Sequence, residues 1–251
     1  MRQFRPSFEQ RFALRERPHD FAIMRQRWAG LLFLHWAVDP VLIAERLPKG
    51  LYVDMFNGNA WLGVVPFFMA RVRPIGLPPL PWLSWFMELN LRTYVYDEDG
   101  NAGVWFFSLD CNQPLAVEIA RRCFHLPYEH AVMRSSIRDN WIEYHSRRKS
   151  TGTSDAEFSY EIPLVHLPAE PGTLEWFLVE RYLLFSSNLA GAIFTGRVHH
   201  APYQISHGGC SQMSTEPIRL CGFPTPFEPP FSVLTAAAVD VTIFPLRRKR
   251  G

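Results

Sequence analysis

One stretch decides the fold: Glu88-Leu89-Asn90-Leu91-Arg92-Thr93-Tyr94-Val95-Tyr96, in which polar and aliphatic side chains alternate with a period of two. Successive side chains of a β-strand point to opposite faces, so this pattern predicts a strand with one polar and one aliphatic face. Asp99-Gly100 then suits a tight turn with positive φ, and the apolar stretch Gly103–Leu109 follows it. We therefore expect an antiparallel hairpin over these residues.

Strand patterns dominate the rest of the chain. Short runs rich in β-branched and aromatic residues recur along the sequence, a composition that favours β-structure. Asn57-Gly58 joins two of these runs and indicates a second hairpin. The predicted strands are Leu31–Val38, Leu51–Phe56, Ala60–Val72, Leu89–Tyr96, Gly103–Leu109, Ala131–Arg138, Trp141–Arg147, Glu157–Ile162, Ala192–His199 and Val239–Phe244.

Three short helices are expected between the strands, over Val41–Leu47, Pro114–Phe124 and Leu174–Phe185, each preceded by a residue suited to an N-cap. Pro74–Trp82 contains four prolines in nine residues and must be a loop. Many antiparallel strands with few helices predict an α+β protein that is mainly antiparallel β. We expect a closed or nearly closed β-barrel with a few short peripheral helices.

Length and composition exclude several classes of protein. The chain has 251 residues, 47% of them hydrophobic, which is enough to bury a substantial core, and we expect residues 1–251 to form a single domain. The longest strongly apolar stretch, 182–196, is shorter than the ~20 residues that a membrane span needs. The N-terminus lacks the apolar region of a signal peptide. These features predict a cytoplasmic protein without a membrane partner.

Basic residues gather at the two ends, residues 1–27 and 246–251. Residues 1–27 hold seven arginines and three acidic residues, and Arg247-Arg248-Lys249-Arg250 lies near the other end. We interpret both ends as solvated, flexible segments, since the body between them is mildly acidic. Binding of nucleic acid usually needs a basic stripe on the folded body, so no nucleic-acid partner is expected.

Motif searches identify no cofactor site. The chain has no P-loop, no dinucleotide-binding glycine pattern, no zinc-protease motif and no nucleophile elbow. Its four cysteines form no metal-type pair, and the adjacent His199 and His200 would point to opposite faces of a strand. We therefore expect neither a cofactor nor a metal ion.

The polar face of the 88–96 strand has two interpretations. Facing a barrel interior, it would gather a carboxylate, a guanidinium group and hydroxyl groups that can bind an organic acid or polarise a carbonyl. Facing solvent, it would be the ordinary polar side of a half-buried strand. A lone histidine in an apolar strand, here His35, is likewise either a core residue or a functional group. The candidates for substrate binding are Arg92, Tyr94, Asn90, His35 and Ser108.

Several segments occur in an order that is typical of one family. They are Leu31-Leu32-Phe33-Leu34-His35-Trp36, Leu47-Pro48-Lys49-Gly50-Leu51, Ala60-Trp61-Leu62-Gly63-Val64-Val65-Pro66-Phe67, Glu88 to Val95, Gly103 to Asp110, Leu126-Pro127-Tyr128, Glu180-Arg181-Tyr182 and Gly196-Arg197-Val198-His199-His200. Across residues 25–245 the chain resembles the uncharacterised bacterial YqjF-like family. That family has no established activity to transfer.

More distantly, the chain is similar to the acetoacetate decarboxylases. The resemblance implies an antiparallel β-barrel around a small-molecule cavity and an active-site glutamate at the position of Glu88. Those enzymes form a Schiff base on the first of two adjacent lysines, whose positions fall on Tyr128 and Glu129 in this chain. The nearest lysine is Lys149, in a basic run typical of a solvated turn. Chemistry through an imine is therefore disfavoured.

We consequently expect a barrel pocket for a small carbonyl compound or organic acid. In the first hypothesis the protein catalyses a lyase, isomerase or hydratase step: Glu88 or Glu129 carries a proton, Tyr128 and Tyr94 donate hydrogen bonds, and Arg92 holds a carboxylate. In the second, the protein has kept the pocket and lost the chemistry, and it serves as a binding protein or sensor. The tryptophans and proline-rich loops either cover a partner surface, as in a homo-oligomer, or roof the barrel.

Overall fold

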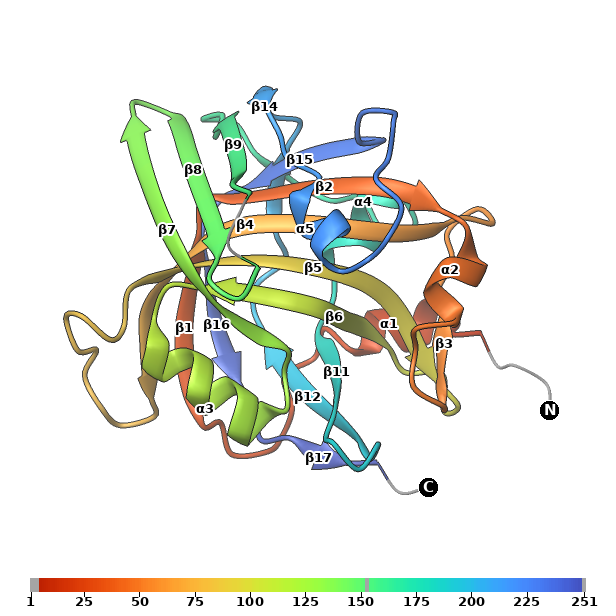
Figure 1. The fold of residues 1–251 in the computed structure, drawn as a ribbon. Helices are drawn as coiled ribbons and strands as arrows, with labels where there is room; N and C mark the ends of the chain where they lie inside the picture. Colours follow the sequence, from red (N-terminus) through yellow and green to blue (C-terminus); the bar gives the residue numbers. More distant parts are fainter. Residues whose placement is uncertain (1–4, 152–153, 250–251) are drawn as a thin grey trace.

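The computed structural model describes residues 5–151 and 154–249 and is built mainly from β-strands (Figure 1). Its strands are β1 (Met24–Ala29), β2 (Leu31–Val38), β3 (Leu51–Val53), β4 (Ala60–Pro74), β5 (Phe86–Asp97), β6 (Ala102–Cys111), β7 (Tyr128–Arg138), β8 (Trp141–Arg148), β9 (Ala156–Glu161), β10 (Leu167–Pro168), β11 (Leu183–Ser187), β12 (Ile193–His199), β13 (Gln204–Ser206), β14 (Cys210–Gln212), β15 (Ser232–Ala236), β16 (Val239–Ile243) and β17 (Arg247–Arg248). Its helices are α1 (Phe8–Ala13), α2 (Pro40–Ala44), α3 (Pro114–Phe124), α4 (Leu174–Val179) and α5 (Glu216–Leu220).

Seven strands pair in a closed circuit, in the order β4, β5, β6, β11, β12, β16, β1 and back to β4. All of these pairs are antiparallel except β6 with β11. The long strand β4 pairs with β2 over its first residues and with β1 over its last, so β2 and β15 branch away from the circuit. The predicted α+β, mainly antiparallel class is confirmed, but the sheet is not a simple barrel.

A second layer covers the outer face of the circuit. Strand β7 runs parallel to the end of β6 and continues into an antiparallel sheet with β8, β9 and β14. One core cluster, with Phe33 and Phe67, lies inside the circuit, and another, with Leu34 and Leu89, lies between the two layers. Because both faces of β5 are covered, all twelve of its residues are buried. The polar face of β5 is therefore turned to the protein interior and not to solvent.

Local sequence signals account for the hairpin of β5 and β6 and for α3. Asn57 and Gly58 both have positive φ, at 50° and 85°, as a tight turn requires, and Phe56 and Asn59 form an isolated bridge across it. The hairpin predicted there is wrong beyond this turn, because β3 pairs with β5, whereas β4 pairs with β1, β2 and β5. The helix predicted over 114–124 is present with those bounds. The helix predicted to end at Phe185 is wrong in its second half, because α4 ends at Val179 and β11, which begins at Leu183, pairs with β6 and β12. The elements α1, β1, α5 and β15 lie outside the predicted elements.

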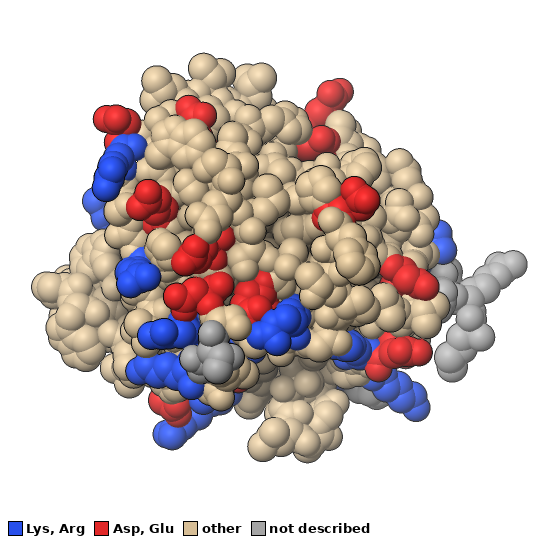
Figure 2. Space-filling view, turned by 45° about the horizontal axis from the view of Figure 1, so that its top comes forward, with Lys and Arg blue, Asp and Glu red and all other residues tan. Residues whose placement is uncertain are grey.

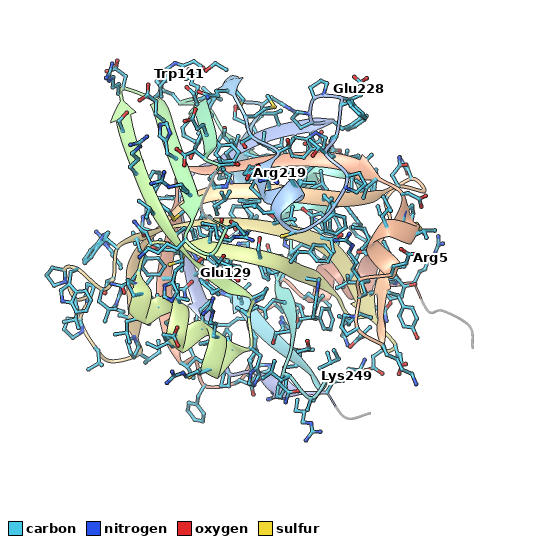
Figure 3. The ribbon with its side chains drawn as sticks, viewed as in Figure 1. Arg5, Glu129, Trp141, Arg219, Glu228 and Lys249 are labelled. Carbon is cyan, nitrogen blue, oxygen red and sulfur yellow. The ribbon has the colours of Figure 1, made fainter. Side chains whose placement is uncertain are left out.

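Segments from both basic ends contact the body in the described residues. Arg11 of α1 pairs with the buried Asp54, and Arg197 donates to backbone carbonyl groups just after α1. At the other end, Lys249 Nζ lies 2.8 Å from a carboxylate oxygen of Asp97, which is 2% exposed (Figure 3). The face drawn in Figure 2 carries acidic and basic side chains side by side. None of the described helices is long and apolar enough to cross a membrane.

Candidate functional site

The inner face of β5 presents a row of buried polar side chains. Glu88, Asn90, Arg92 and Tyr94 alternate with Leu89, Leu91 and Thr93, and the two leucines belong to the layer between the sheets. The exposed fractions of these four side chains are 3%, 4%, 8% and 0%. Polar groups are costly to bury unless they are hydrogen-bonded, so each needs a partner or a function. The row divides into two sites, one at Glu88 and one at Arg92.

Glu88 shares a hydrogen bond with Tyr128. Tyr128 Oη donates to Glu88 Oε2 at 2.7 Å, and both residues are buried. Strand pairing creates this contact, since β5 pairs with β6 and the start of β7 lies beside the end of β6. From the outer layer, Tyr144 Oη donates to the Glu88 carbonyl oxygen at 2.8 Å and holds the backbone. The carboxyl group is thus fixed in position from two strands.

The environment of Glu88 favours a carboxyl group that exchanges protons near neutral pH. Burial raises the pKa of Glu88 from 4.5 to about 7, although the hydrogen bond from Tyr128 acts in the opposite direction. No described arginine, lysine or histidine forms an ion pair with this carboxylate. Burial, together with the charge of Glu88, raises the pKa of Tyr128 well above 10, so the phenol keeps its proton. A buried acid with a pKa near 7 is suited to general acid–base chemistry.

The second site is built around the guanidinium group of Arg92. Arg92 Nη2 donates to the Leu178 carbonyl oxygen at 3.0 Å, at the end of α4. Tyr94 Oη donates to the same oxygen at 2.8 Å and lies 2.7 Å from His35 Nε2. Because the Tyr94 hydroxyl donates its hydrogen bond to the Leu178 carbonyl oxygen, it accepts one from His35. We therefore assign the Nε2–H tautomer to His35. Burial and then the charge of Arg92 hold the pKa of His35 well below 6.5, so the ring is neutral.

Three buried polar atoms around Arg92 have no hydrogen-bond partner: Asn90 Oδ1, Arg92 Nε and His35 Nδ1. No described carboxylate pairs with Arg92. The ordinary structural role of Arg92 is to satisfy a carbonyl at the C-terminal end of α4, where a cation is favourable. That role uses one nitrogen of the guanidinium group, Nη2. The positive charge of the group has no acidic partner among the described residues and can attract an anion.

A buried ion pair lies beside this group. Arg181 Nη1 is 2.9 Å from Asp54 Oδ2, and Arg11 of α1 pairs with the same carboxylate. The Arg181 guanidinium group lies 4.9 Å from the ring centre of Tyr94. Burial lowers the pKa of Arg181 to about 10, which still leaves it charged at neutral pH. Sequence reasoning missed Asp54, and no local pattern identifies it, because its partner is 127 positions away.

Two predicted site residues lie elsewhere. Glu129 follows Tyr128 on β7 and points to the opposite side, where its carboxylate lies 3.4 Å from Arg121 Nη2 (Figure 3). Ser108 faces the layer between the sheets, and its Oγ is 3.3 Å from Cys221 Sγ. The structure therefore brings Glu88 together with Tyr128, and Arg92 with Asn90, Tyr94 and His35, but places Glu129 and Ser108 on the other side of the sheet.

The three lysines lie away from Glu88. Lys49 and Lys149 are exposed, and Lys249 pairs with Asp97 and Asp99 near the C-terminal end. None of these lysine amines is therefore placed to form an imine beside Glu88. Within the described residues, no group of three His, Cys, Asp or Glu side chains is arranged to hold a metal ion.

Two surface hollows flank the circuit of strands. The larger, of about 820 Å³, is lined by residues of the 161–175 segment and of β13. The smaller, of about 370 Å³, is lined by Arg15, Tyr182 and His200 among others. Burial lowers the pKa of His200 to about 4. Neither hollow is lined by Glu88 or Arg92.

Solved structures with the same fold identify its class. An acetoacetate decarboxylase from Legionella pneumophila subsp. pneumophila str. Philadelphia 1 matches with a TM-score of 0.62 and 12% identity, covering 100% of this chain and 98% of that one. The enduracididine biosynthesis enzyme MppR, complexed with pyruvate, matches with a TM-score of 0.60 and 10% identity over 92% of this chain and 91% of its own. At such identities the likeness shows the fold, which is acetoacetate decarboxylase-like.

Sequence relatives identify the family. The uncharacterized protein YqjF of Bacillus subtilis (strain 168) is 35% identical over 231 residues, which cover 92% of this chain and 94% of that protein. The family DUF2071, described as an uncharacterized conserved protein, matches residues 25–240. The resemblance drawn from the sequence is confirmed. The chain belongs to the DUF2071 family and has an acetoacetate decarboxylase-like fold.

Proposed function

We propose that the protein binds a small oxo acid or related organic acid in its interior and that Glu88 transfers a proton to or from it, without a Schiff base. The observation that carries this proposal is a buried carboxyl group with a pKa of about 7, hydrogen-bonded to Tyr128. At neutral pH the protonated and ionised forms of such a group are both populated, which a group that transfers protons requires. The reaction class is a lyase, isomerase or hydratase step on a carbon next to a carbonyl group.

Arg92 would bind the carboxylate of that ligand through its unpartnered Nε, and the guanidinium group has no acidic partner among the described residues. Asn90 Oδ1 is also unpartnered, and as an acceptor it would bind a hydroxyl group of the ligand. Arg92 lies four positions after Glu88 on the same strand, so their Cα atoms are about 13 Å apart, and both side chains face the interior. The names of the fold neighbours, acetoacetate decarboxylase and a pyruvate complex, agree with an oxo acid.

The alternative function is non-catalytic: a binding protein or sensor for the same class of ligand. The absence of a lysine beside Glu88 favours it, because the acetoacetate decarboxylases, which this chain resembles, form a Schiff base on a lysine. In this case Arg92 provides the affinity, and Glu88 contributes a hydrogen bond without turnover. The two functions differ in one observable, the exchange of a carbon-bound proton with solvent.

The experiment compares binding with proton exchange for the same ligands. Pyruvate, acetoacetate, 4-oxopentanoate and 2-oxoglutarate are incubated with the protein in D₂O, and loss of the ¹H signal next to the carbonyl is followed by NMR. Binding is measured by calorimetry. Glu88→Gln keeps the shape of the side chain and removes the transferable proton, and Glu129→Gln is the matched control on the outer side of the same sheet. Arg92→Met tests the carboxylate site, with circular dichroism to verify folding.

Three results separate the hypotheses. Exchange by the native protein that Glu88→Gln abolishes and Glu129→Gln preserves supports the enzyme. Binding without exchange, lost in Arg92→Met, supports the non-catalytic alternative. Neither binding nor exchange with any of these acids refutes both. A cytoplasmic location, a single domain, the lack of a nucleic-acid partner and assembly into a homo-oligomer stay predictions from the sequence.

A further inference from the structure

The loop between β4 and β5, residues 75–85, buries a polar side chain and exposes its large apolar ones. It projects from the body beside α3 (Figure 1), and the corresponding projection at the left of Figure 2 carries no charged side chain. Ser84 is 1% exposed, and its hydroxyl accepts a hydrogen bond from the Leu80 amide at 2.8 Å. The apolar side chains point outward instead: Ile75 is 44% exposed, Leu77 58%, Leu80 50%, Trp82 70% and Trp85 44%.

The loop is held in this conformation by the rest of the chain. Gln113 Nε2, at the start of α3, donates to the Trp82 carbonyl oxygen at 3.1 Å. The Val72 amide donates to the Ser84 carbonyl oxygen at 3.1 Å and closes the base of the loop. Prolines restrict the backbone further. An ordered loop that displays tryptophan and leucine to solvent marks a contact surface, and Leu115 of the neighbouring α3 is also exposed, at 44%.

Three arginines at the base of the loop lack acidic partners. Arg25 on β1 is the cross-strand neighbour of Arg73 on β4, and Arg71 lies in the irregular part of the same pairing with a positive φ of 53°. None of the three pairs with a carboxylate among the described residues. Like charges placed opposite each other on a sheet are unfavourable, so a partner that supplies negative charge would stabilise this arrangement.

We propose that the 75–85 loop inserts into the surface of a bilayer containing anionic phospholipids, and that Arg25, Arg71 and Arg73 bind the lipid phosphates. Tryptophan, leucine and proline enter the boundary between headgroups and acyl chains, and guanidinium groups bind phosphate in two-point contacts. The sequence expectation of no membrane partner rested on the lack of a spanning segment, which binding at the surface does not need. This inference is independent of the proposed function of the interior.

The charge of the surface argues against a second copy of the chain as the occupant. In a symmetric contact the same patch meets itself. The three arginines of each copy would then enter one contact with no acidic residues from either side to balance them. A lipid surface supplies the missing negative charge, and a projecting loop fits a deformable headgroup layer.

Sedimentation with lipid vesicles tests the proposal on the full chain. One set of vesicles is phosphatidylcholine alone, and the other is phosphatidylcholine and phosphatidylglycerol in a two-to-one mixture. We expect at least about tenfold tighter binding to the anionic vesicles at low salt, and weaker binding at high salt. The double variant Leu77→Ser/Trp82→Ser should lose at least about tenfold in affinity. Leu164→Ser/Phe227→Ser is the matched control, since these side chains are 95% and 104% exposed elsewhere on the molecule.

Arg25→Gln separates the charge contribution from the apolar one, because it should weaken anionic binding and leave the folded state intact by circular dichroism. The proposal is overturned by equal binding to both kinds of vesicle, by the absence of binding, or by loop variants that bind like the native protein. It is also overturned if analytical ultracentrifugation shows an oligomer that the loop double variant dissociates, because the loop is then an interface between protein chains.

Discussion

Glu88→Gln should change how the stability of the protein depends on pH. Burial raises the pKa of Glu88 from 4.5 to about 7, so the folded state holds a proton that the unfolded chain releases between these two values. At about 1.36 kcal/mol for each unit of pKa, this difference is worth about 3 kcal/mol. Above pH 7 the folded protein must keep a charged carboxylate that is 3% exposed, and it loses that amount of stability.

The sign follows from the direction of the shift. A carboxyl group with a raised pKa in the folded state stabilises the fold below its unfolded pKa, and this contribution disappears as the pH rises from 4.5 to about 7. The glutamine variant carries no titratable group here. It should therefore gain about 3 kcal/mol relative to the native protein between pH 4.5 and pH 8.

Urea unfolding at pH 5 and pH 8 measures this difference for both proteins. Asp110, whose pKa burial raises to about 6, shifts the stability in the same direction, but it contributes equally to both proteins and cancels in the comparison. Glu129→Gln is the control and should keep the part of the pH dependence that comes from Glu88, because it leaves the Glu88 carboxyl group in place. If Glu88→Gln and the native protein lose the same amount of stability between pH 5 and pH 8, Glu88 does not titrate near neutral pH. The proposed role of Glu88 in proton transfer is then refuted.

Three further predictions concern the interior. Asp54→Asn leaves a buried guanidinium group without its counter-charge and should cost about 3 kcal/mol in urea unfolding, whereas Asp240→Asn, in a pair whose carboxylate is 78% exposed, should cost less than about 1 kcal/mol. Gly63→Ala places a Cβ 3.1 Å from the ring of His35 and should destabilise by about 1–3 kcal/mol, read from the same unfolding curves. Cys111, which is 1% exposed and has a pKa raised to about 12 by burial, should resist iodoacetamide at pH 8 until urea is added, as mass spectrometry can show.

Local sequence patterns predicted the parts of the fold that depend on near neighbours. The alternation around Glu88 predicts a strand because side-chain direction follows the backbone, and Asn57-Gly58 predicts a turn because few residues adopt positive φ easily. Leu174–Phe185 shows the limit of such patterns. Its first half forms α4, but the second half joins β11, because pairing with two strands outweighs the local preference for a helix.

The candidate site could be predicted only in part. The residues of its polar row and the match of Glu88 to a decarboxylase glutamate were available from the sequence, and so was the lack of a lysine near Tyr128. The roles given to Glu129 and Ser108 could not be checked without the fold, since a single step along a strand reverses the side of the sheet that a side chain faces. The ion pair of Asp54 could not be anticipated, because its partner comes from a distant segment.

The sequence by itself determined which residues alternate, where the chain turns and which family it belongs to, because these depend on neighbours along the chain. Only the tertiary structure decided that both faces of β5 are buried and that Tyr128, 40 positions away, donates a hydrogen bond to Glu88. Burial and long-range hydrogen bonds depend on which strands pair and on what covers them. These same factors set the pKa of Glu88, so the chemistry of this side chain is a property of the fold.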